Sequence, residues 1–103
     1  HNLAVSDLTI GFKELCFNNK IDIVTYSPLG AGFLTGKYNS GIITGSRFEV
    51  IPGHQDIYFN EQSLRKLEML KKISDSTGYT MVHLALAWAL HQSGIKSVLI
   101  GGT

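Results

Sequence analysis

The sequence predicts an α/β fold built from parallel strand–helix units. Two short, mostly apolar runs rich in β-branched residues, at 21–26 and 97–100, indicate strands. Helical patterns and a long loop separate them, an alternation that is typical of parallel sheets with both faces covered. The predicted order is the end of a strand, a helix, a strand, a long loop, two helices and a final strand.

The three helices are predicted from the spacing of their apolar side chains and from their caps. The first is expected over 5–19, where Ser6 or Asp7 can cap it. Its apolar face comprises Leu8, Phe12, Leu15 and Cys16. The second is expected over 60–76, with Asn60 as its N-cap.

The third helix is expected over 81–92, with Thr80 as its N-cap and Gly94 as its C-cap glycine. Its composition is so apolar that it must be buried almost all round.

Residues 27–60 form a loop with six of the eleven glycines and both prolines. Loops of this length are usually functional or disordered. Five aromatic residues favour an ordered loop: Phe33, Tyr38, Phe48, Tyr58 and Phe59.

Composition and charge exclude several classes of function. Nine Lys and Arg against eight Asp and Glu leave a formal charge of +1, which supports neither a nucleic acid nor an anionic membrane as partner. The single cysteine, Cys16, forms no internal disulfide, and neither it nor the histidines show metal-ligand spacing. The longest apolar stretch is too short to cross a bilayer. We therefore expect a cytoplasmic protein without a metal, and the absence of an initial Met suggests a fragment.

The segment 26–38, directly after the first predicted strand, carries the clearest candidate chemistry. Its glycines let backbone N–H groups approach an anion, and its hydroxyl and ammonium groups add hydrogen bonds and charge. These residues are Gly30, Gly32, Gly36, Ser27, Thr35 and Lys37. The spacing is not that of a Walker loop, because Ala31 and Tyr38 replace required residues. Phosphate binding and an ordinary glycine-rich turn both remain open.

Two features adjoin this segment. Tyr26 offers a flat face for a planar ligand, although an aromatic at the end of a strand is often core packing. In a parallel sheet, residues 101–103 would lie beside the 26–38 segment. Periodicity leaves a doubly wound sheet and a (β/α)8 barrel open, and both bind ligands at the carboxyl ends of their strands.

Four stretches give the chain a specific resemblance to one family. They are IVTYSPLGAGFLTGKY (23–38), GSRF (45–48), LALAWAL (84–90) and SVLIGGT (97–103). The chain resembles the carboxyl-terminal part of an aldo-keto reductase, in the branch related to bacterial reductases and potassium-channel β subunits. The resemblance implies an incomplete fragment of a (β/α)8 TIM barrel. Residues 1–103 would be a single partial domain from the end of strand 6 to the end of strand 8.

The resemblance also implies a site for NADP(H). Tyr26 matches the aromatic that stacks on the nicotinamide, which is Trp in channel subunits. Lys37 and Arg47 match basic positions at the adenosine phosphate end, and Gly101 and Thr103 match the loop that meets the 2′-phosphate region. The turn that holds the pyrophosphate is matched by Ser27, Pro28, Leu29, Gly30 and Ala31.

The implied function is that of an NADP-dependent oxidoreductase. The family's catalytic Asp, Tyr, Lys and His belong to the amino-terminal half of the barrel, so we assign no catalytic residue here. The full-length protein is expected to transfer a hydride between nicotinamide and a small-molecule aldehyde or ketone, and these residues alone to be inactive. The alternatives are an NADP(H)-binding regulatory subunit like the channel β subunits, or an inactive barrel fragment.

Overall fold

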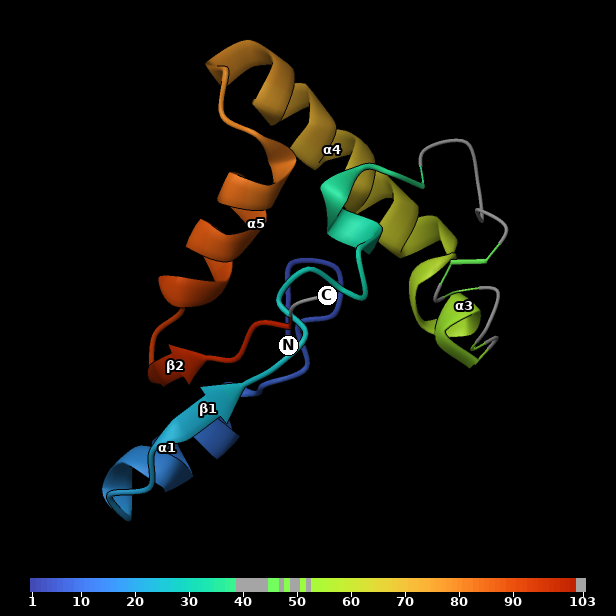
Figure 1. The fold of residues 1–103 in the computed structure, drawn as a ribbon. Coiled ribbons are helices and arrows are strands. Elements are labelled where there is room, and N and C mark those ends of the chain that lie inside the picture. Colours follow the sequence, from blue (N-terminus) through green and yellow to red (C-terminus); the bar gives the residue numbers. More distant parts are fainter. Residues whose placement is uncertain (39–44, 47, 49–50, 52, 102–103) are drawn as a thin grey trace.

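The computed structural model describes residues 1–38, 45–46, 48, 51 and 53–101 of the chain. The elements are α1 (Ile10–Asn18), β1 (Ile23–Thr25), the 3-10 helix η1 (Phe33–Thr35), α3 (Gly53–Tyr58), α4 (Glu61–Thr77), α5 (Met81–Leu90) and β2 (Ile95–Val98). Figure 1 shows α4 and α5 diverging from a shared turn, with α5 leading to β2 beside β1. No helix of the described residues is long and apolar enough to span a membrane.

β1 and β2 form a two-stranded parallel sheet. Ile23 pairs with Ile95 and Thr25 with Val98. The Leu99 amide donates to the Thr25 carbonyl with an N···O distance of 2.8 Å, so pairing continues past the end of β2. Because α4 and α5 lie between the two parallel strands in the chain, the predicted strand–helix–strand unit is confirmed. Two parts of the predicted order are wrong: residues 1–9 contain no strand end, because the side chain of Asn2 holds them in a turn, and residues 53–58 of the predicted loop form α3.

The strand bounds predicted from sequence were inaccurate. β1 is shorter than the predicted 21–26, and β2 begins and ends two residues before the predicted 97–100. The physical reason for the shift of β2 is the turn after α5. Gly94, at φ 81°, completes that turn, so the chain is already extended at Ile95. The C-cap of α5 itself is His91, not Gly94.

The start of α1 also differs from the prediction. Thr9, rather than Ser6 or Asp7, is its N-cap and accepts a hydrogen bond from a first-turn amide. The preceding segment is held in a turn by Asn2, whose side-chain oxygen accepts hydrogen bonds from the amides of Ala4 and Val5. These backbone groups are therefore committed to a turn instead of a helix.

The predicted N-caps of α4 and α5 are confirmed. The Asn60 and Thr80 side chains accept hydrogen bonds from the amide of the third residue of each helix.

Helices α5 and α1 bury fewer of their side chains than predicted. In α5, Ala85 and Ala89 are buried but Leu90 is 59% exposed, so the expectation of burial all round was wrong. On the predicted apolar face of α1, Cys16 is buried while Phe12 and Leu15 are exposed.

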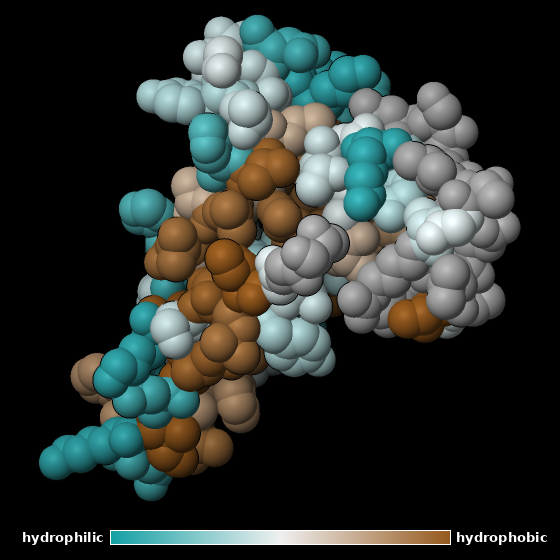
Figure 2. All heavy atoms as spheres, in the orientation of Figure 1, coloured by the Kyte–Doolittle hydropathy of each residue, from teal (hydrophilic) through white to brown (hydrophobic). Residues whose placement is uncertain are grey.

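The core is built largely from the long loop after β1. Its buried side chains are Phe33, Leu34, Tyr38, Phe48 and Tyr58, packed with Ala4, Leu67, Leu70 and Ala85. Tyr38 and Phe48 meet edge to face with ring centroids 4.8 Å apart. The prediction of an ordered, aromatic-rich loop is confirmed for the described residues. Figure 2 shows apolar residues gathered over α5 and the two strands, where Val24, Leu99 and Ile100 are exposed.

Candidate functional site

A cavity of about 710 Å³ opens at the carboxyl ends of β1 and β2. Ten residues line it: Tyr26, Ser27, Pro28, Leu29, Ala31, Gly32, Lys37, Leu99, Ile100 and Gly101. They come from the segment after β1 and from the segment after β2, which the parallel pairing brings side by side. The cavity therefore lies at the end of the sheet where α/β proteins bind ligands.

The turn after β1 has a strained backbone. Ser27 and Ala31 adopt positive φ angles of 54° and 56°, and Gly30 and Gly32 lie at 60° and 90°. A left-handed conformation costs a non-glycine residue about 1–2 kcal/mol. Among the described residues only Lys20 shares this feature with Ser27 and Ala31. Such strain persists only where surrounding contacts hold it, and it concentrates at functional sites.

This turn leaves backbone donors unused. The Gly30 amide donates to the Ser27 carbonyl at 3.1 Å, and the Phe33 amide donates to the Gly30 carbonyl at 3.0 Å. Across the described part of the chain, the amides of Leu29, Ala31 and Gly32 donate to no protein acceptor. Unpaired N–H groups in a turn with left-handed residues form a concavity that favours anions.

Lys37 adds a positive charge to the same turn. A Cβ placed on Gly32 would lie 2.7 Å from Lys37 Cε and 3.0 Å from its Nζ, so the ammonium group lies against the turn. Its Nζ is also 5.1 Å from the centroid of the Tyr38 ring. Lys37 belongs to none of the ion pairs found among the described residues. Its charge is therefore not neutralised by a carboxylate there.

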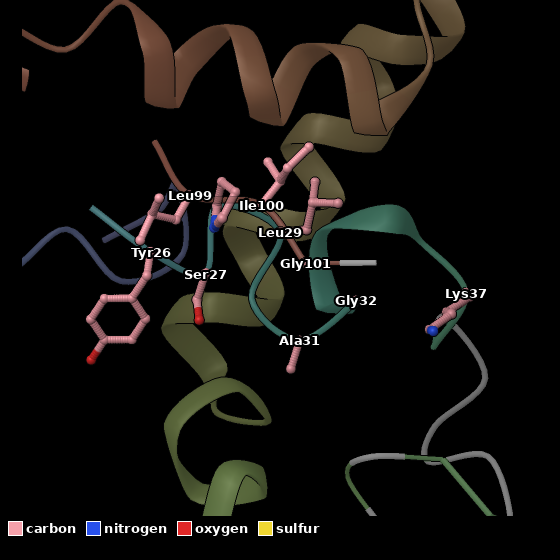
Figure 3. Close-up of a pocket in the computed structure, with 10 residues that line it drawn as sticks. Tyr26, Ser27, Leu29, Ala31, Gly32, Lys37, Leu99, Ile100 and Gly101 are labelled. Atoms are coloured by element: carbon pink, nitrogen blue, oxygen red, sulfur yellow. The ribbon is translucent and has the colours of Figure 1, made fainter. Parts of the chain in front are cut away.

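Tyr26 presents its ring to solvent at the rim of the cavity. Its side chain is 70% exposed, so the described residues leave most of the ring uncovered. Figure 3 shows Tyr26, Ser27 and Ala31 projecting to the same side of the turn, with Lys37 farther along the loop. The exposed ring is accessible to a planar group, and stacking is the interaction it can supply.

Residues 3–103 match the aldo/keto reductase family over nearly the whole chain. The chain belongs to this family. It is 36% identical to a probable voltage-gated potassium channel subunit beta from Arabidopsis thaliana, over 89% of this chain and 29% of that protein. It is 32% identical to L-glyceraldehyde 3-phosphate reductase of Escherichia coli K12, over 90% of this chain and 28% of that protein.

Another relative of this aldo/keto reductase chain is a putative voltage-gated potassium channel subunit beta from Schizosaccharomyces pombe, 35% identical over 76% of this chain and 24% of that protein. The chain spans less than a third of the length of these relatives. The predicted family and its branch, which joins reductases and channel β subunits, are thus confirmed.

The structure gathers most of the predicted site residues of this family member. Seven line the cavity: Tyr26, Ser27, Pro28, Leu29, Ala31, Lys37 and Gly101. Gly30 lies in the same turn without lining the cavity, and Arg47 and Thr103 lie outside the described residues. Leu99 and Ile100 also line it but were not predicted. They are the last two residues of the predicted strand 97–100, and the carboxyl end of that strand was the signal that could have found them.

Proposed function

We propose that this chain forms the NADP(H)-binding part of an oxidoreductase that transfers a hydride between nicotinamide and an aldehyde or ketone. One observation carries the proposal. The strained turn after β1 places three unpaired amides and an ammonium group without a carboxylate partner beside one cavity. That combination suits a phosphate group. The reductase among the relatives supports an oxidoreductase.

The residues present fit the groups of such a cofactor. The exposed Tyr26 ring would stack on the nicotinamide, and the turn formed by residues 27–31 would hold the pyrophosphate. Lys37 and Arg47 would pair with phosphate at the adenosine end, with Gly101 and Thr103 near the 2′-phosphate. The bound cofactor supplies the hydride, and these residues bind and orient it.

We further propose that residues 1–103 form one partial domain of a (β/α)8 barrel, from the end of its sixth strand to the end of its eighth. The parallel pairing of β1 and β2 across a helical connection supports this architecture. The carbonyl's proton donor then comes from outside these residues. A chain limited to residues 1–103 is expected to oxidise no NADPH, and an aldehyde-dependent activity in that chain would contradict the assignment.

A second candidate is an NADP(H)-binding regulatory subunit, favoured by the relatives named as potassium channel subunits. Tyr26, in place of the Trp of channel subunits, favours the enzyme. The two differ in turnover, so the full-length protein should be titrated with NADPH and NADH by fluorescence and then assayed on a panel of aldehydes and ketones. Binding with turnover supports the reductase, binding without turnover supports the regulatory subunit, and binding of neither cofactor overturns both.

A further inference from the structure

Asn2 connects three segments that are distant in the sequence. Its side chain is almost fully buried, at 1% exposure. Oδ1 accepts hydrogen bonds from the amides of Ala4 and Val5, each at 2.9 Å. Nδ2 donates to the Ser27 carbonyl at 2.8 Å and to Tyr58 Oη at 3.1 Å. Because backbone amides only donate, the atom that they meet must be the oxygen, which fixes the orientation of the Asn2 amide.

Tyr58 contacts the same turn through its ring. It is buried, and its ring lies 5.4 Å from that of Phe33 in a stacked arrangement. A Cβ on Gly30 would lie 2.7 Å from Tyr58 Cε1. The Tyr58 ring thus supports Gly30 directly, and its hydroxyl supports Ser27 through Asn2.

The Ser27 carbonyl is where these contacts converge. It accepts one hydrogen bond from the Gly30 amide within the turn and another from Asn2 Nδ2 outside it. Ser27 and Ala31 both hold left-handed conformations that non-glycine residues adopt at a cost. Contacts from outside the turn must offset this cost. Besides the Phe33 amide, which donates to the Gly30 carbonyl, side chains from distant segments reach the turn: Asn2 at Ser27 and Tyr58 at Gly30.

We propose that Asn2 and Tyr58 are a positioning pair, which keeps the turn of residues 27–32 in its anion-binding conformation and thereby sets the affinity for the phosphate groups of the cofactor. This role rests on the proposed function. Neither residue needs to touch the ligand. Loss of one hydrogen bond of the pair lets the turn relax, which changes the positions of its unpaired amides beside the cavity.

Two conservative variants of the full-length protein test the pair. Tyr58→Phe removes one hydroxyl and leaves the ring against Gly30. Asn2→Asp keeps the acceptor for the amides of Ala4 and Val5 but removes the donor to Ser27. Ser6→Ala is the matched control, because it deletes a hydrogen bond from Ser6 Oγ to the Asn2 carbonyl at 3.0 Å without reaching the turn.

Two measurements separate the positioning role from the proposed function. Hydrogen–deuterium exchange of residues 27–34 without ligand is expected to be faster in both variants and unchanged in Ser6→Ala. The Kd for NADPH is expected to rise about fivefold in both variants, the effect of one hydrogen bond. If the variants lower the Tm but leave the Kd for NADPH and the exchange of residues 27–34 unchanged, Asn2 and Tyr58 have only a structural role. That result would overturn the proposed positioning role.

The remaining outcomes are also decisive. If Asn2→Asp fails to fold, Tyr58→Phe alone decides, because it removes a single oxygen atom. If exchange accelerates but the wild-type protein binds neither NADPH nor inorganic pyrophosphate, the proposed function fails and the positioning role fails with it. If the wild type binds NADPH and both variants bind it equally well, only the positioning role is overturned.

Discussion

Apolar side chains are more deeply buried in the long loop after β1 than in the helix α1. In the loop, Phe33, Leu34 and Phe48 are each 0% exposed. In α1, Ile10 is 76% and Phe17 is 83% exposed. The loop's η1 contacts α5, whereas Figure 1 shows α1 at the far end of β1. An apolar side chain is buried where another element faces it, regardless of its own local structure.

This difference bears on the candidate site. The turn of residues 27–32 runs directly into η1, so its strained backbone is attached to the best-packed part of the described chain. Close-packed surroundings transmit small volume changes instead of absorbing them. Substitutions in the loop should therefore affect both stability and ligand binding, whereas substitutions in α1 should affect neither strongly.

The largest expected effect is on stability. Phe33→Ala in a chain of residues 1–103 should lower the free energy of unfolding by about 3–5 kcal/mol, because it opens a cavity in the aromatic core. Phe17→Ala, which removes the same side chain from an exposed position, should change it by less than about 0.5 kcal/mol. Urea unfolding of both variants measures the contrast. Equal losses would show that α1 is as well packed as the loop.

The next effect isolates the contact between the turn and the core. Gly30→Ala should lower the free energy of unfolding by about 2–4 kcal/mol, for two reasons. The backbone at Gly30 has a positive φ, and the added Cβ would overlap the Tyr58 ring. Gly78→Ala, also at positive φ but in open space, should cost only about 1–2 kcal/mol. Thermal unfolding compares the two. A smaller loss for Gly30→Ala than for Gly78→Ala would show that the Tyr58 ring yields easily.

The third effect is on cofactor choice. Lys37→Ala or Arg47→Ala should weaken NADPH binding by about 1.5–3 kcal/mol per contact and NADH binding by less, because bonds between charged groups and phosphate are strong. Lys96→Ala is the control. Its Nζ pairs with Asp22 at a distance of 3.0 Å, and Lys96 does not line the cavity. Fluorescence titration measures both cofactors. Equal losses for the two would mean that these side chains do not read the 2′-phosphate.

Local sequence signals predicted those features that local chemistry determines. Asn60 and Thr80 cap their helices as expected, because the capping oxygen and its amide lie three residues apart. The position of the loop at the end of a parallel strand predicted which segments meet at the cavity. Features that depend on distant partners were missed. Asn2 reaches Ser27 and Tyr58 across 25 and 56 positions, and no short-range pattern encodes such hydrogen bonds.

The same distinction explains the errors in α1 and α5. The spacing of Phe12 and Leu15 correctly indicated a helix but could not show whether another element covers that face. In α5, an apolar composition was taken to mean burial on all sides. Ala85 and Ala89 alone among its residues are fully covered, because η1, α4 and β2 approach that helix from limited directions.

The smallest expected effect concerns the exposed ring at the cavity rim. Tyr26→Ala should weaken NADPH binding by about 0.5–1.5 kcal/mol and slow hydride transfer, because a stacking face that orients the nicotinamide is lost. Tyr26→Trp should keep both, since a larger flat ring offers the same face. Tyr79→Ala is the matched control, because Tyr79 is also an exposed tyrosine, at 63%, but lies in the turn between α4 and α5. Single-turnover kinetics at saturating NADPH measures the step itself, and an unchanged rate in Tyr26→Ala would leave Tyr26 as a surface aromatic without a role in orienting the cofactor.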